Sequence, residues 1–287
     1  MNIELPIAIL CFLLNSFYFV DLHKFNVKLE VNMEEIQDFT IIDENKIIDV
    51  VMTAGRILLE SGAETYRVED TMARIATSYG LENTHSFVTS TAIIFSLNDR
   101  TNTRLIRIDE RTTDLEKISL TNQISRKIAN NELSIDEAKS ELIHLHHAAL
   151  QFPFWLKVLA AAIASACFLP MFGGKQAEVI PSFIAGGTGY LTMSIVHNTI
   201  RIKFFTEFIS SLIIATIATI SVNFFIGVNL SLITIASVMP LVPGVLITNA
   251  IRDLMAGQLL AGISKGVEAA LTAFAIGAGV AIVLLLS

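Results

Sequence analysis

The pattern of apolar and polar positions changes near residue 153 and divides the chain in two. After this point, apolar stretches of about the 20 residues that a helix needs to cross a membrane alternate with short polar connections. Short connections favour antiparallel neighbours in a compact bundle. The expected spans are Phe154–Phe172, Val179–Val196, Phe208–Gly227, Leu230–Ala250 and Leu259–Leu286. The connections are Gly173–Glu178, His197–Glu207, Val228–Asn229 and Ile251–Gln258.

Lysine and arginine near the span ends indicate the orientation of this bundle. Arg201 and Lys203 lie between spans two and three, and Arg252 and Lys265 lie around the junction of spans four and five. The opposite side carries only Lys175. Because positive residues favour the cytoplasmic side, we expect the N-terminal half to be cytoplasmic and the C-terminus to lie outside.

In the first part of the chain, apolar residues recur at the spacing of amphipathic helices and strands, which is typical of a soluble module. Apolar residues at helical spacing predict a helix over Asn45–Glu60. Ser61 and Glu64 fit a capping box for a second helix. That helix runs to about Tyr79, and Gly80 suits its C′ position.

A β-hairpin is expected after these helices. Alternation of apolar and polar positions predicts one strand over Ser86–Leu97 and a partner strand over Thr103–Glu110. The loop between them is Asn98–Asn102. Further along, Ser134 and Glu137 form a second capping box that predicts the start of another helix.

Two helices complete the module, over about Thr113–Ala129 and over Ile135–His147. The order of elements is therefore ααββαα, and residues 33–153 are long enough to bury a small core. The predicted fold is an α-helical membrane protein, in which a small cytoplasmic α+β module precedes a domain of five transmembrane helices at residues 154–287.

The first 32 residues belong neither to the predicted module nor to the predicted membrane domain. Leu5–Val20 is apolar, but it is short for a span and lacks the preceding positive residues of a signal peptide. Residues 29–33 can be encoded by DNA that contains GGAGGTG just before the ATG of Met33, as in a bacterial ribosome-binding site. We expect translation to start at Met33, with residues 1–32 as leader. The alternative is an N-terminal membrane-associated helix.

Composition supports a membrane protein and excludes several functions. Apolar residues make up 53% of the chain, the mean hydropathy is +0.61, and 37 of the 47 charged residues lie in residues 1–153. A pI near 5.4 without a basic stripe argues against nucleic-acid binding. Cys11 and Cys167 form no disulfide framework.

The fourth span carries the strongest signal for a binding site. Pro240 and Pro243 each remove a backbone donor, and Gly244 adds flexibility. A broken helix within a membrane is tolerated where it lines a cavity, and in transporters that cavity is usually the substrate site. We therefore expect these three residues to contribute to substrate binding.

Polar residues gather just after this break. Thr248 and Asn249 can hydrogen-bond a small polar solute, and Arg252 can bind a carboxylate. Asp253 is a candidate proton carrier. The alternative is a proline-kinked helix in which Arg252 and Asp253 mark the membrane interface.

Glu268 in the fifth span is a second candidate for proton coupling. It either titrates within the membrane or pairs with Lys265, and the sequence does not decide between the two. Glycines elsewhere in the spans are better explained by close helix packing than by substrate binding. These glycines are Gly186, Gly187, Gly189, Gly262 and Gly266.

Matches to enzyme motifs are weak. The GxSxG pattern around Ser264 lies at the start of a span, without the strand–turn–helix context of a nucleophile elbow. His144 and His147 lack the surrounding ligands of a metal site. We expect no enzymatic activity, no cofactor and no metal.

Specific residues carry a resemblance to a known family. The stretch from Gly55 to Glu69, which contains SGAETYRVE, resembles the threonine/serine exporter (ThrE) family, and so do the threonine-rich segment Ser86–Leu97 and Pro243-Gly244 with the Asn249–Asp253 segment. The similarity covers about residues 45–287 and is closest to the YjjP-type split subunit of that family.

The resemblance implies export of small metabolites across the bacterial inner membrane. Threonine and serine are associated with the family, and succinate with the split type. Full-length members resemble two fused membrane halves, so a short YjjB-type membrane protein is the expected partner, besides membrane lipid and a possible second copy of the chain. No GxxxxGK[ST] motif is present, so we expect an ion gradient to supply the energy.

A different class of function remains as the alternative. Residues 45–150 can act as a regulatory or enzymatic module that the spans merely tether. An anchor needs only one or two plain apolar helices, whereas five are expected here and one of them is broken. This difference favours the exporter.

Overall fold

The computed structural model describes residues 33–97, 103–150, 152–200, 202–224 and 228–286. Residues 44–287 form one compact unit and residues 1–43 another, of which only the start of helix α2 is described. The expectations for residues 1–32 and for the hairpin loop Asn98–Asn102 lie outside the described residues.

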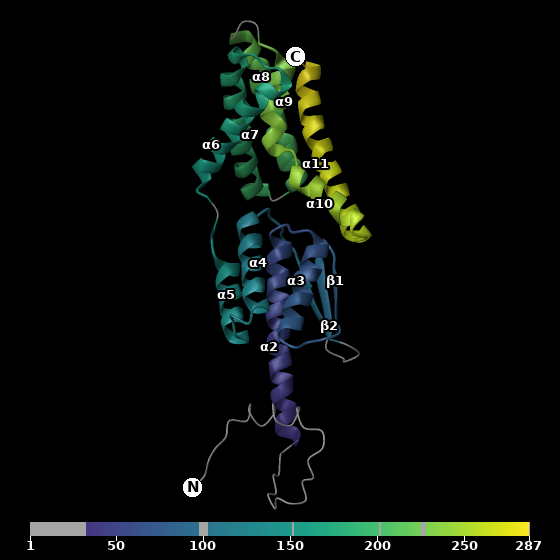
Figure 1. The fold of residues 1–287 in the computed structure, drawn as a ribbon. Helices are drawn as coiled ribbons and strands as arrows, with labels where there is room; N and C mark the ends of the chain where they lie inside the picture. Colours follow the sequence, from purple (N-terminus) through teal and green to yellow (C-terminus); the bar gives the residue numbers. More distant parts are fainter. Residues whose placement is uncertain (1–32, 98–102, 151, 201, 225–227, 287) are drawn as a thin grey trace, which may run out of the picture. The chain divides into compact units, whose positions relative to one another are not determined.

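Residues 44–150 are called the N-terminal module below. The module opens with the part of helix α2 (Met33–Glu60) from residue 44 onward and with α3 (Thr65–Ser78) (Figure 1). The expected C′ glycine is confirmed, because Gly80 has a φ of +84°. The expected Ser61 capping box is wrong. The turn at Gly62 moves the helix start to Thr65, with Glu64 as an N-cap whose side chain makes no capping hydrogen bond.

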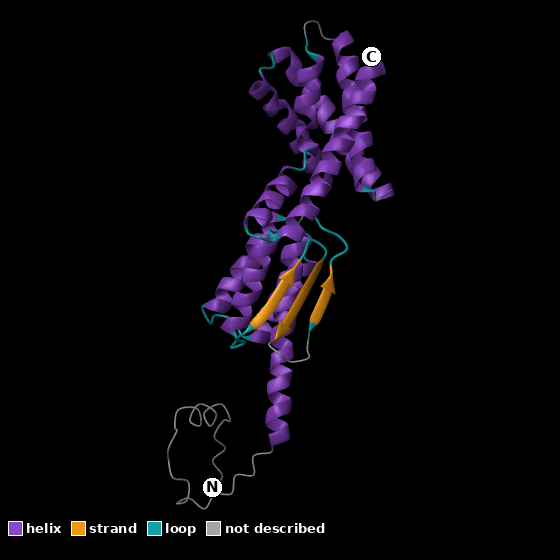
Figure 2. Ribbon diagram, turned by 90° about the vertical axis from the view of Figure 1, so that its right-hand side faces the viewer, coloured by secondary structure: helices purple, strands orange, loops and turns teal. Residues whose placement is uncertain are grey.

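Three antiparallel strands follow instead of two (Figure 2). They are β1 (Thr84–Val88), β2 (Ala92–Leu97) and β3 (Arg104–Arg107), in the order β1-β2-β3. The single strand expected over Ser86–Leu97 is wrong because the chain turns at Thr89, whose N–H donates to Ala92 O at 2.9 Å. The turn itself contains threonines, which are common in strands. The alternation of apolar and polar residues therefore continues through the turn and does not reveal it.

Helices α4 (Leu115–Ala129) and α5 (Ile135–His147) complete the module. The Ser134 capping box is confirmed, since Glu137 N donates to Ser134 Oγ and Ser134 N donates to Glu137 Oε2. The core of the module is one apolar cluster from helices and sheet. Its fully buried members include Met72, Ile75, Ile93, Phe95 and Leu142.

Among the described residues of the second half, four helical segments are long and apolar enough to cross a membrane. They are Phe154–Phe172, Gln176–Ile200, Lys203–Phe224 and Leu259–Leu286. A bent pair, Leu230–Leu241 with Gly244–Met255, makes a fifth if it counts as one span. Their helices are α6 (Phe154–Phe168), α7 (Val179–Ile200), α8 (Lys203–Phe224), α9 (Leu230–Val238), α10 (Gly244–Met255) and α11 (Leu259–Leu286).

The expected break in the fourth span is present. Helix α9 ends in a 3₁₀ turn at Met239–Leu241, and α10 begins at Gly244 at an angle of 61°. The expected connection His197–Glu207 is shorter than predicted, because both flanking helices continue through its polar residues until Ile200 and from Lys203.

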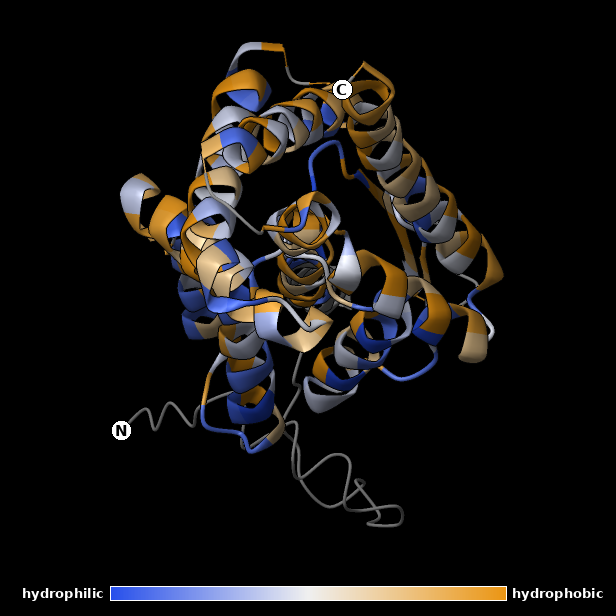
Figure 3. Ribbon diagram, turned by 90° about the horizontal axis from the view of Figure 1, so that it is seen from above, coloured by the Kyte–Doolittle hydropathy of each residue, from blue (hydrophilic) through white to orange (hydrophobic). Residues whose placement is uncertain are grey.

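Large apolar side chains lie exposed along this helical domain, as for helices that face lipid, and many residues of its helices have the orange colour of hydrophobic residues in Figure 3. Phe274 and Ile263 of α11 are 76% and 56% exposed. Small residues lie where helices meet. A Cβ on Gly187 of α7 would lie 3.0 Å from Ala162 Cβ of α6, so these two helices approach closely.

Candidate functional site

The loop between α2 and α3 docks on α10 and α11 through a buried ion pair. Asp253 of α10 is fully buried, and its Oδ2 accepts from Lys265 Nζ of α11 at 2.7 Å. Its Oδ1 accepts from the backbone N–H of Thr65 at 2.9 Å. Lys265 Nζ also donates to Ala63 O at 3.2 Å. The consecutive helices α10 and α11 and a loop 188 to 202 positions earlier therefore share one set of buried polar contacts.

The geometry of α3 explains why a carboxylate is needed here. The first N–H groups of a helix have no partner within the helix, and the Glu64 side chain does not cap α3. Asp253 supplies that acceptor and a negative charge at the helix N-terminus. A residue of α10 thus caps a helix of the N-terminal module.

Two more contacts flank this pair. Asn249 Nδ2 donates to Gly62 O at 2.8 Å, and Arg252 Nη1 donates to Glu64 Oε1 at 2.7 Å. Gly62 has a φ of +86°, a conformation that glycine adopts without strain. The structure therefore places Asn249 and Arg252, both expected to bind substrate, in contact with the module.

The pKa values of two glutamates of the module, Glu64 and Glu69, shift in opposite directions in this environment. Burial raises the pKa of Glu64, but the Arg252 hydrogen bond and the Arg67 charge outweigh it and hold the pKa below the ordinary value of 4.5. Burial dominates for Glu69 and raises its pKa. Glu69 accepts from Val88 N at 2.9 Å and from Gln258 Nε2 at 2.5 Å.

A second charged cluster ties the module to α11 about one turn beyond Lys265. Glu268 Oε2 accepts from Arg111 Nη2 at 2.6 Å, and its Oε1 accepts from Lys203 Nζ at 2.8 Å. Arg111 lies between β3 and α4, and Lys203 begins α8. Glu268 thus pairs with these two cations, whereas Lys265 pairs with Asp253.

A cavity of about 460 Å³ lies between the module and the helix break. An adjoining hollow of about 320 Å³ shares part of its lining with the cavity. Both are lined by Arg111, Lys203, Glu207 and Glu268. Among the residues expected from sequence, Pro240, Pro243, Gly244 and Asn249 line the larger cavity. Thr248 and Arg252 are not part of the lining, and Thr248 Oγ1 donates to Val245 O.

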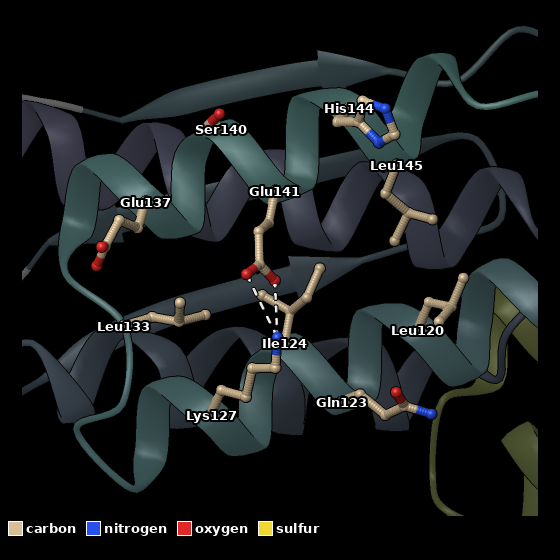
Figure 4. Close-up of a pocket in the computed structure, with 10 residues that line it drawn as sticks. All are labelled: Leu120, Gln123, Ile124, Lys127, Leu133, Glu137, Ser140, Glu141, His144 and Leu145. Carbon is tan, nitrogen blue, oxygen red and sulfur yellow. Dashed lines mark hydrogen bonds and ion pairs between the residues drawn. The ribbon is translucent and has the colours of Figure 1, made fainter.

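The N-terminal module has a separate hollow of about 540 Å³ between α4 and α5 (Figure 4). Lys127 Nζ lies 3.2 Å from Glu141 Oε2 across it. Its lining combines this exposed ion pair with apolar side chains such as Ile124 and Leu133. It lies apart from the helix break and shares no lining residue with the larger cavity there.

Comparison with known proteins identifies the family. The family model described as "Putative threonine/serine exporter" matches residues 49–287. The chain belongs to the threonine/serine exporter family. No solved structure shows a significant match to it.

Curated relatives of this exporter-family chain are distant in sequence. A "Probable threonine/serine exporter" of Mycobacterium tuberculosis is 21% identical over 77% of the chain, which spans only 42% of that relative. A "Probable succinate transporter subunit YjjP" of Klebsiella aerogenes is 24% identical over 83% of the chain and 93% of the relative. The Escherichia coli protein of the same name is 24% identical over 84% of the chain and 94% of its own length.

The sequence analysis does not single out three charged residues of the cavity at the helix break: Arg111, Lys203 and Glu207. In the sequence, Lys203 indicates only the orientation of the spans, and Glu207 falls in the expected connection His197–Glu207. Ionisable residues at the edge of a span are functional candidates in general, and that signal was available for both. Nothing local distinguishes Arg111 from the other arginines of the module.

The glycines expected at helix contacts lie against neighbouring helices. Gly186 faces Ser165 of α6, and Gly189 faces Ile214 of α8. A Cβ on Gly262 would lie 2.6 Å from Leu254 Cγ of α10, and one on Gly266 would lie 4.0 Å from Ala250 Cβ. Within the described residues, no group of three or more His, Cys, Asp or Glu side chains could hold a metal ion.

Proposed function

We propose that this chain is a subunit of a secondary exporter of small carboxylate metabolites, namely threonine, serine or succinate. The observation that carries the proposal is the cavity at the broken helix, which is lined by charged side chains from both halves of the chain. A plain membrane anchor has no need of such a cavity. Concave sites with a few polar groups are the usual form of small-molecule sites.

The lining of the cavity suits an anionic group. Lys203 and Arg111 supply positive charge at its edge. Gly244, Val245 and Leu246, the first turn of α10, also line it, and a helix N-terminus presents free N–H groups and a partial positive charge. All three proposed substrates have a carboxylate that these groups can bind.

The space at the break is open on the side of Gly244. A Cβ at this position would meet no other atom within 4 Å. We assign Pro240, Pro243 and Gly244 to the substrate chamber, together with Asn249. Arg252 serves the contact with Glu64 in this conformation, and Thr248 is exposed outside the lining of the cavity.

We place the N-terminal module in the bacterial cytoplasm, on the side where Arg201 and Lys203 connect two spans. An ion gradient supplies the energy in this proposal, with Asp253 and Glu268 as the carboxylates that exchange partners or protons. Both are ion-paired in the present conformation. Collapse of the pH gradient and the membrane potential is expected to stop export.

We also propose a short YjjB-like membrane protein as the partner. Two relatives that match nearly full length are named as subunits. The chain spans less than half of the Mycobacterium tuberculosis relative. A second membrane protein that supplies the remaining part of the transporter accounts for both facts.

The test is efflux of labelled threonine, serine and succinate from bacterial cells that express the chain, with and without a candidate partner. Efflux that requires both proteins and stops when the gradients are collapsed supports the proposal, and the labelled species names the substrate. Absence of efflux for all three substrates with both proteins present would overturn it.

A further inference from the structure

Glu268 occupies the position that a bound carboxylate would take between two cations. Arg111 binds one of its oxygens at 2.6 Å, and Lys203 binds the other at 2.8 Å. A carboxylate that bridges a guanidinium and an ammonium forms two charge-assisted hydrogen bonds in this way. We propose that Arg111 and Lys203 are the carboxylate subsite of the transporter, and that Glu268 is an internal competitor which the substrate displaces.

This inference rests on the proposed export of small carboxylates, and the burial of the cluster supports it. The Arg111 and Glu268 side chains are 24% and 21% exposed, and Lys203 is 46% exposed. A solute can therefore reach the cluster from the two hollows that it lines. Partial removal from water also makes the charge interactions stronger than on an open surface.

The other cations near the cavity are already committed elsewhere. Lys265 is buried with Asp253, and Arg252 holds Glu64. Release of Lys265 from Asp253 would leave a fully buried carboxylate without its partner charge, which is costly. Arg111 and Lys203 are released when Glu268 alone moves, because among the described residues Glu268 is the carboxylate that forms an ion pair with each of them.

Displacement of Glu268 also changes a contact between the two halves of the chain. Arg111 belongs to the N-terminal module, and Glu268 belongs to α11. A substrate carboxylate between Arg111 and Lys203 replaces this contact and frees α11 from Arg111. Because Glu268 competes for the subsite, the apparent affinity for substrate equals the intrinsic affinity multiplied by the fraction of time for which the subsite is free.

The test is equilibrium binding of labelled succinate and labelled L-threonine to the purified full-length chain in lipid nanodiscs. Glu268→Gln removes the competing charge and preserves the shape of the side chain. We expect it to tighten binding of at least one probe by about five- to tenfold, as for a competitor that holds the subsite most of the time. Arg111→Gln is expected to weaken the same binding by about tenfold or more.

The double variant shows whether Glu268 acts through Arg111. If Glu268 only competes for the cations, Glu268→Gln gains less affinity in the Arg111→Gln background than in the wild type. Glu141→Gln is the matched control, because it breaks the Lys127 pair in the separate hollow between α4 and α5 (Figure 4). Its affinity for both probes is expected to equal that of the wild type.

The outcomes separate this inference from the proposed function. Binding by the wild type that Glu268→Gln leaves unchanged or weakens would overturn the competitor role and leave the exporter proposal standing. If neither labelled succinate nor labelled L-threonine binds to the wild type, the proposed carboxylate site is overturned together with the subsite. Should Glu268→Gln fail to fold, Glu268→Asp retracts the carboxylate by one methylene, and an intermediate gain in affinity is the expected result.

Discussion

The carboxylate of Asp253 caps helix α3 by accepting the backbone N–H of Thr65 at 2.9 Å, across 188 positions of sequence. The same carboxylate holds Lys265 at 2.7 Å in a site where Asp253 is fully buried. One side chain of the membrane half therefore stabilises both the start of a module helix and a buried cation. The two halves of the chain are joined at this point by contacts that exclude water.

Asp253→Asn is expected to destabilise the protein strongly. The amide still accepts a hydrogen bond from Thr65, but the buried Lys265 cation loses its counter-charge. Breaking a buried ion pair typically costs about 3–5 kcal/mol, which denaturant or thermal unfolding of the purified chain measures. Asp70→Asn is the control, since its pair with Arg74 is exposed and is worth less than about 1 kcal/mol. Equal losses in both variants would contradict the buried role of Asp253.

Gly62→Ala is expected to destabilise the docked loop more than Gly80→Ala. Both glycines have a positive φ, at +86° and +84°, so both substitutions cost the order of 1 kcal/mol in backbone strain. A Cβ on Gly62 would also lie 2.9 Å from Thr112 O, whereas one on Gly80 meets nothing within 4 Å. The difference between the free energies of unfolding of the Gly62→Ala and Gly80→Ala variants measures the destabilisation that the close contact with Thr112 O adds at Gly62.

A larger loss of stability in Gly80→Ala than in Gly62→Ala would contradict a role for the close contact between Gly62 and Thr112. Proteolysis provides a second measurement, which reports on the loop around Gly62 alone. Gly62 O accepts from Asn249 Nδ2, so a shift of the loop is expected to increase proteolytic cleavage near Gly62, which Gly80→Ala leaves unchanged.

Local signals in the sequence predicted the elements that depend on local physics. The first and last spans, Phe154–Phe172 and Leu259–Leu286, agree with the structure residue for residue. The Ser134 capping box and the break at Pro243 were also predicted, since a cap and a proline act within one turn of their own position. Such features need no knowledge of the tertiary structure.

Pairings between distant polar groups could not be predicted in this way. Glu64 fits a capping box with Ser61, yet its partner is Arg252, 188 positions later. Glu268 has Lys265 one turn away, yet it binds Arg111 and Lys203. Several oppositely charged residues are available to each carboxylate, and only the packing of the module against α10 and α11 decides between them.

Acidification is expected to weaken the contact between Glu64 and Arg252. The folded-state pKa of Glu64 lies below its ordinary value of 4.5, so its contribution to stability is present above pH 4.5 and is lost as the pH falls through the folded pKa. Glu64→Gln removes this titration. The melting temperature of the wild type should therefore fall more between pH 7 and pH 4 than that of Glu64→Gln.

Glu69 provides a control of opposite sign. Its pKa is raised by burial, so its contribution to stability declines as the pH rises through the range above 4.5. Glu69→Gln should accordingly lose less stability than the wild type as the pH rises from 4 to 7. Identical pH profiles for the wild type and Glu64→Gln would show that the Arg252 contact contributes nothing to folding.

Glu207→Gln is expected to separate amino-acid substrates from succinate. Glu207 is 7% exposed and lines both hollows. It lies beside the Thr272 hydroxyl, yet its Oε2 has no hydrogen-bond partner of normal geometry among the described residues. The ammonium of threonine or serine can satisfy this oxygen, whereas succinate has no donor to offer. The substitution should weaken threonine binding by about tenfold, as for a hydrogen bond to a charged group.

Competition of unlabelled threonine and succinate against a labelled probe measures the ratio of the two affinities. Glu178→Gln is the matched control, because Glu178 is a buried carboxylate whose oxygens bind Lys175 N and Asn229 N instead of the cavity. It should lower stability and leave the affinity ratio unchanged. An equal effect of Glu207→Gln on both substrates would show that the carboxylate shapes the site without recognising the ammonium, because a purely structural defect cannot discriminate between two ligands that share the same carboxylate subsite.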